Sequence, residues 1–82
     1  MSMNDQRAHN CRELIQEIVQ TINAQSYLEV GVNVKGTYNH ISCSLKVGVD
    51  SVYPATYTMT SDAFFAMNTQ SFDVIFVDAC HN

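Results

Sequence analysis

The chain has 82 residues, enough for one small domain, and its 46% apolar and 15% charged residues are typical of a folded protein rather than a disordered one. The net charge is −4, and the four Lys and Arg residues form no basic stripe, so direct binding to the phosphate backbone of nucleic acids is not expected. No apolar run reaches the roughly 20 residues that span a bilayer, and the polar N-terminus does not resemble a signal peptide. We therefore expect no membrane association and a cytoplasmic location.

The first predicted element is an amphipathic helix over Asp5–Asn23. Its apolar residues recur at helical spacing and are expected to share one face: Cys11, Leu14, Ile15, Ile18, Val19 and Ile22. We expect residues 1–25 to pack as an N-terminal helix on a sheet formed by residues 26–82, within a single partial domain.

Two strand–helix–strand units are predicted to follow. The first comprises a strand in "SYLEVGV", a short helix over Gly36–Ser44 and a buried strand in "LKVGVD" that ends on Asp50. The second begins after a turn at Pro54 and comprises a strand in "ATYTM", a helix through "DAFFAMN" capped by Thr60 or Ser61, and a strand in "DVIFVD" buried on both faces. The aromatic residues Tyr38, Phe64, Phe65 and Phe72 are interpreted as core.

This alternation predicts an α/β fold with a Rossmann-like, mostly parallel sheet of about four strands flanked by helices. One connection strains the prediction, because the link between Asp50 and Ala55 is too short for a helical crossover. An extended crossing over a short strand would fit, as would an antiparallel strand, so the direction of the strand near Ala55–Met59 stays open.

Four of the eight acidic residues fall at or just beyond the ends of the apolar runs: Glu29, Asp50, Asp62 and Asp78. In an open parallel sheet these ends share one edge, where ligands bind. Carboxylates gathered at this edge would repel one another unless they bind a partner. Ribose hydroxyls, an amino group, a sulfonium or a metal could each be that partner. Asp50 and Asp62 are also common turn and cap residues, whereas a carboxylate inside "YLEVGV" is costly to bury without a partner.

The cysteines and histidines do not indicate a metal centre. Cys11, Cys43 and Cys80 are widely spaced, so neither a disulfide framework nor a zinc site is predicted. Three reduced cysteines suit a reducing compartment. His9 and His40 are interpreted as surface residues.

In this order, "YLEVGVNVKGTYNHI", "KVGVD", "MTSDAFF" and "FDVIFVDACH" resemble the class I S-adenosylmethionine-dependent methyltransferases. The resemblance covers about Tyr27–His81 and the preceding helix. It implies transfer of a methyl group from S-adenosylmethionine to an acceptor, a small molecule by our expectation. Metal-dependent O-methyltransferases in the family place an aspartate at the position of Asp78.

By position, the resemblance assigns roles to eight residues. It implies cofactor binding by Glu29, Gly31, Asn33, Asp50, Ser61 and Asp62, and catalysis by Asp78 and His81. Asp50 corresponds to the acid that bonds the ribose hydroxyls, and Ser61 and Asp62 correspond to the segment beside the adenine. The resemblance implies that Asp78 lies beneath the transferred methyl group and that His81 orients or deprotonates the acceptor.

The resemblance further implies an incomplete methyltransferase fold. The family has seven strands, and this chain supplies the first four, so the half that shapes the acceptor pocket is missing from it. Asn33 and Lys35 stand where the family commonly has glycines. The alternative hypothesis is a non-catalytic remnant or interaction module that forms oligomers through its open sheet edge. A nicotinamide-dinucleotide site is disfavoured, because no G-x-G-x-x-G is present.

Overall fold

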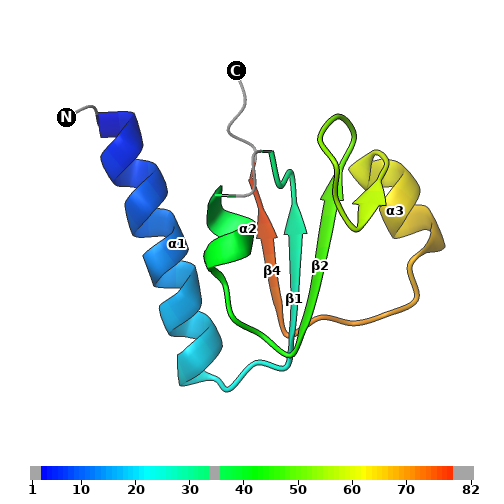
Figure 1. Ribbon diagram of the computed structural model, residues 1–82. Helices are drawn as coiled ribbons and strands as arrows, with labels where there is room; N and C mark the ends of the chain where they lie inside the picture. The colour runs from blue at the N-terminus through cyan, green and yellow to red at the C-terminus, as the bar shows by residue number, and fades with distance from the viewer. Residues whose placement is uncertain (1–2, 34–35, 79–82) are drawn as a thin grey trace.

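The computed structural model describes residues 3–33 and 36–78 (Figure 1). Its elements, in chain order, are α1 (Met3–Thr21), β1 (Ser26–Val30), α2 (Gly36–His40), β2 (Leu45–Asp50), β3 (Tyr57–Thr58), α3 (Ser61–Met67) and β4 (Val74–Val77). Each predicted helix and strand is therefore present. Four are shorter than the segments predicted for them: β1 ends at Val30, α2 ends at His40, β3 has two residues, and β4 spans Val74–Val77.

The four strands form one sheet in the order β3-β2-β1-β4, and every neighbouring pair is parallel. The chain adds β2 and β3 on one side of β1 and then returns to place β4 on the other side, as in the 3-2-1-4 portion of a Rossmann sheet. The α/β prediction is thus confirmed.

The structure settles the direction of β3, which runs parallel to β2 through the pairs Val49–Tyr57 and Asp50–Thr58. Because β3 has only two residues, the chain has to travel back by only about 7 Å before it starts. The six residues between Asp50 and Tyr57 reach up to about 20 Å when extended. The short link is therefore long enough without a helix.

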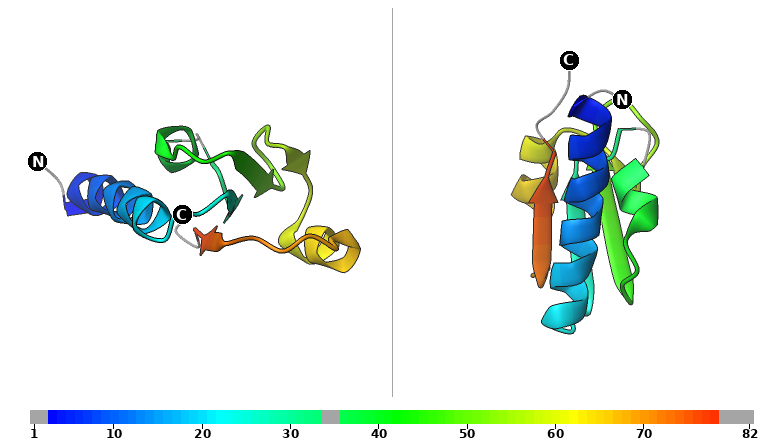
Figure 2. Two further views of the ribbon diagram at one scale, coloured as in Figure 1. Left: turned by 90° about the horizontal axis from the view of Figure 1, so that it is seen from below. Right: turned by 90° about the vertical axis from the view of Figure 1, so that its left-hand side faces the viewer.

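Helices cover the sheet on both faces (Figure 2). On one face, Ile15 and Val19 of α1 pack with Tyr27 and with Ile41, which follows α2. On the other face, Phe64 of α3 packs against Leu28, Val47 and Val49. α3 starts at Ser61 because Thr60 is its N-cap, with a side-chain oxygen that accepts the Ala63 N–H at 3.1 Å.

Three expectations about burial are wrong. Among the apolar α1 residues whose side chains are described, only Ile15 and Val19 are buried; Leu14 and Ile18 are exposed, as is Ile22 just after the helix. β4 is not buried on both faces, because Ile75 and Val77 are 51% and 59% exposed. The seven-residue α3 packs against β2 and leaves that face of β4 uncovered, and its own Phe65 is 48% exposed rather than in the core.

Within the described part of the chain, no helix has both the length and the hydropathy required to cross a membrane.

Candidate functional site

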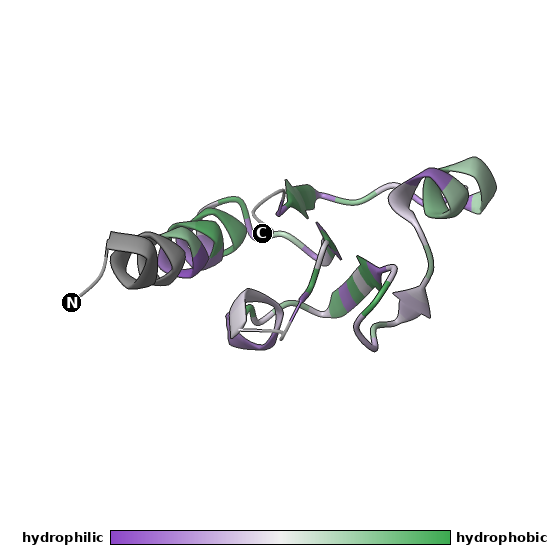
Figure 3. Ribbon diagram, turned by 90° about the horizontal axis from the view of Figure 1, so that it is seen from above, coloured by the Kyte–Doolittle hydropathy of each residue, from purple (hydrophilic) through white to green (hydrophobic). Residues whose placement is uncertain are grey.

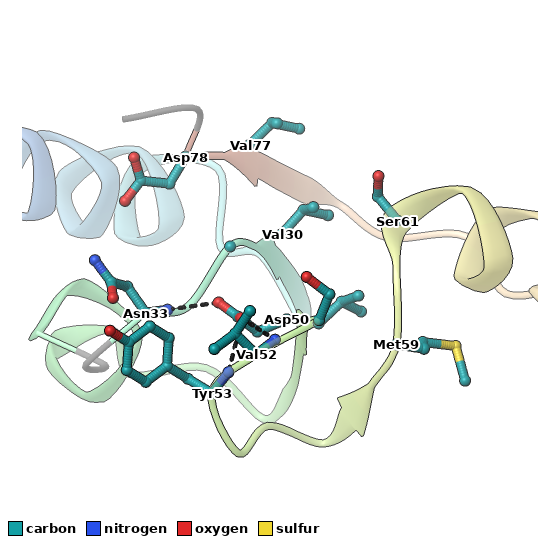
Figure 4. A pocket seen from close by; sticks show the side chains of 12 residues that line it. Val30, Asn33, Asp50, Val52, Tyr53, Met59, Ser61, Val77 and Asp78 are labelled. Atoms are coloured by element: carbon teal, nitrogen blue, oxygen red, sulfur yellow. Dashed lines mark hydrogen bonds between the residues drawn. The ribbon is translucent and has the colours of Figure 1, made fainter. Parts of the chain in front are cut away.

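A pocket of about 750 Å³ opens at the carboxyl ends of β1, β2 and β4 (Figure 4). The chain leaves β1 toward β2 and later returns to its other side as β4, so this is the point where the strand order reverses. Ligands of open α/β sheets bind at such points. Five of the predicted site residues line the pocket: Gly31, Asn33, Asp50, Ser61 and Asp78.

Gly31 lets the loop after β1 pass close to the end of β4. Its φ of +86° lies in the left-handed region, and a Cβ built there would lie 2.7 Å from the Asp78 carbonyl oxygen. Its N–H donates to the Val49 carbonyl oxygen at 2.7 Å. A side chain at this position would strain the backbone and overlap the Asp78 carbonyl group, so only glycine fits this turn. Asn33 also has a positive φ, 53°, which asparagine tolerates better than most residues.

Asp50, the last residue of β2, joins two loops of the pocket. Its Oδ2 accepts the Asn33 N–H at 2.9 Å, and its Oδ1 accepts the N–H groups of Val52 and Tyr53 at 2.8 and 2.9 Å (Figure 4). Burial opposes ionisation of this group, but the three N–H donors outweigh it and hold the pKa of Asp50 below its ordinary value. A carboxylate has about four acceptor positions, so one remains on Oδ2 for a ligand.

Glu29 lies beneath the pocket rather than in its lining. Its side chain is 1% exposed, and its Oε1 accepts the Tyr27 hydroxyl at 2.6 Å. Burial raises the pKa of Glu29 to about 7, and the charge of Asp78 adds to this, while the Tyr27 bond and Lys46 act in the opposite direction. The partner required by a buried carboxylate is thus a tyrosine, and Glu29 has no direct access to a ligand in the pocket.

The remaining predicted residues are distributed as follows. Ser61 lines the pocket from the first turn of α3, whereas the neighbouring Asp62 is exposed and does not line it. Asp78 lies at the end of β4, where its N–H donates to the Val30 carbonyl oxygen at 2.8 Å. His81 lies outside the described residues. The four acids therefore do not all meet: two line the pocket, one lies beneath it and one faces solvent.

Sequence reasoning did not assign the other lining residues to the site: Val30, Val49, Ser51, Val52, Tyr53, Met59 and Val77. Val52 and Tyr53 follow Asp50 after Ser51, and their N–H groups bind its carboxylate, so their place is fixed by that residue. An apolar and an aromatic residue two and three positions after a strand-end acid are a usable signal in the sequence. They give the pocket an apolar wall beside its two carboxylates.

The pocket is suited to an uncharged or cationic ligand with hydroxyl or amino groups. None of the described residues that line it is Lys or Arg, and two are aspartates. The described residues contain no group of three or more His, Cys, Asp or Glu side chains that could hold a metal ion. Comparison of the chain with models of protein families, with curated proteins and with solved structures gives no match.

Proposed function

We propose that this chain is the cofactor-binding portion of an S-adenosylmethionine-dependent methyltransferase. The observation that carries the proposal is the combination at one pocket of the Gly31 turn, the strand-end acid Asp50 and the second acid Asp78. The same residues carry the sequence resemblance. The volume of the pocket also lies within the range found for small-molecule binding sites.

The described residues fit the chemical groups of this cofactor. The open acceptor position of the Asp50 carboxylate suits one ribose hydroxyl, and the apolar wall formed by Val52 and Met59 suits a flat purine ring. The sulfonium and amino groups are cationic, which two aspartates favour and a basic lining would not. The free thiols of Cys11 and Cys43 agree with the cytoplasm as the proposed compartment.

Methyl transfer from a sulfonium depends mainly on in-line placement of donor and acceptor. The cofactor supplies the activated methyl group when it is bound. In this proposal Asp78 orients the acceptor, an unidentified small molecule, at the end of β4, and His81 assists it in proton transfer. Asp78 and Ser61 line different sides of the pocket (Figure 4).

Calorimetric titration with S-adenosylmethionine tests the proposal. We expect saturable binding, weakened at least tenfold by Asp50→Asn, which keeps the shape of the side chain but removes its charge. Asp62→Asn should leave the affinity unchanged because Asp62 is outside the pocket. Glu17→Gln, on the exposed side of α1, is the control for the lost charge.

Because Asp50 also holds two loops together, each variant must first be shown to unfold cooperatively. A folded wild-type chain that does not bind S-adenosylmethionine or its demethylated product would refute the proposal. Equal affinity of the wild type and Asp50→Asn would refute the assigned role of Asp50.

A further inference from the structure

An apolar surface at the open edge of the sheet lies outside the pocket and has no part in the proposed function. It comprises two patches, one on α1 and one on β4. Leu14, Ile18 and Ile22 form the α1 patch, and Ile75 and Val77 form the β4 patch; all five are between 43% and 59% exposed. β4 is the last strand of the sheet on this side, so its outer edge is unpaired within the described residues.

The α1 patch projects beyond the edge of the sheet. Gln16 marks the opposite side of α1, because its Oε1 accepts the Ser42 N–H at 2.8 Å, next to α2. Leu14 and Ile18 are each two residues from Gln16, which places them about 200° around the helix. Figure 3 shows apolar residues along the side of α1 that faces away from α2. The α1 patch therefore lies above the space next to β4 in which a further strand would fit.

The β4 patch lies on the opposite face of the sheet. Val74 and Phe76 pack beneath α1, and side chains alternate along a strand, so Ile75 and Val77 point to the other side. The backbone of the same two residues points outward. The Asp78 N–H bonds to Val30 of β1, so in a parallel ladder residues 74, 76 and 78 face β1 and residues 75 and 77 face the open edge.

We propose that this surface binds a second copy of the chain, turned over so that the α1 patch of each copy covers the β4 patch of the other. The two patches occupy the same edge on opposite faces, so an approximate twofold axis along β4 brings both pairs together at once. Such a self-complementary interface closes with two copies. The two β4 strands then run in the same direction, as all neighbouring strands of the sheet do.

The ladder and the steric requirements agree with this arrangement. A shift of one residue from the exact twofold pairs Ile75 of one copy with Phe76 of the other, which keeps both side chains on one face and uses the outward N–H groups. Pairing without turning over is blocked by α1. Each α1 packs on its own β4, so strands about 4.8 Å apart would bring the two helices to about 5 Å, whereas packed helices need 8–10 Å.

Charge sets the conditions for association. Each copy has a net charge of −4, and Asp73 and Asp78 stand at the two ends of β4. Parallel β4 strands bring these aspartates of the two copies together. Association is therefore expected to strengthen as the ionic strength rises.

Sedimentation equilibrium of the full chain over a wide range of concentration tests the proposal. We expect the wild type to dimerise, and Ile18→Lys and Ile75→Lys each to lose the dimer. Ile18 and Ile75 are both exposed in the isolated chain, so neither change should affect folding. Thermal unfolding of each variant checks this. Phe65→Lys, at a similarly exposed apolar residue on α3, is the control and should stay dimeric.

The double variant Ile18→Lys with Ile75→Glu distinguishes this dimer from others. In the proposed arrangement each new lysine meets a new glutamate of the other copy, so the dimer should return. A wild-type monomer at every concentration, or a dimer that survives both single lysine changes, would overturn the proposal. Restoration by mixing Ile18→Lys with Ile18→Glu, and not by the double variant, would also overturn it, because helix would then meet helix.

Discussion

The buried Glu29 makes the stability of this protein depend on pH in a direction opposite to that of most carboxylates. Its pKa is raised from 4.5 to about 7 in the folded state. The folded state therefore binds the proton more tightly than the unfolded state between these two values. The stabilisation by protonated Glu29 is complete below about pH 4.5, falls as the pH rises, and is lost above about pH 7. The two pKa values correspond to a fall of roughly 3 kcal/mol in the free energy of unfolding.

Urea unfolding of the wild type and of Glu29→Gln across this pH range measures the effect. The variant cannot ionise at this position, so the difference in stability between the two proteins should change by roughly 3 kcal/mol in favour of the variant as the pH rises. Groups that do not interact with Glu29 contribute equally to both proteins and cancel. Tyr27→Phe removes a bond that lowers the pKa of Glu29, so its stability should level off only above pH 7.

Two results would refute this reasoning. One is the same pH dependence in the wild type and in Glu29→Gln, which would mean that the carboxyl group is already solvated in the folded state. The other is a wild type that becomes more stable relative to the variant as the pH rises, which would mean that the pKa is lowered. Glu17→Gln, at an exposed residue of α1, is the control variant for the removal of one carboxylate.

Substitutions at three further places, the Gly31 turn, the N-cap of α3 and the packed face of α3, are tested by urea unfolding. Gly31→Ala should lower the stability by about 1–2 kcal/mol through its positive φ, and by more if the Asp78 carbonyl cannot move; an unchanged midpoint would contradict the described turn. Thr60→Ala should cost about 1 kcal/mol by removing the N-cap of α3, and Thr60→Ser should restore most of it. Phe64→Ala should cost about 3–5 kcal/mol and Phe65→Ala much less, because only Phe64 is buried; equal losses would contradict this orientation of α3.

The sequence alone was sufficient for the features that depend on neighbouring residues. The apolar run "LKVGVD" predicted β2 with the observed bounds, and of the two caps left open for α3, Thr60 and Ser61, the structure has Thr60. The place of the pocket also followed, since strand ends of a parallel sheet meet at one edge, and Gly31, Asp50 and Asp78 were named for it. The cofactor and the reaction stay predictions.

Tertiary structure decided what depends on distant residues. The same helical spacing connects Ile15 with Ile18, but only the position of α1 over β4 buries the first and exposes the second. The parallel direction of β3 depended on how far the chain must return, and the orientation of Glu29 depended on Tyr27 on the same face of β1. A pattern of apolar residues records which side chains prefer to leave water. It does not record how much cover the fold provides, and for this reason the exposed faces of α1 and β4 could be found only in the structure.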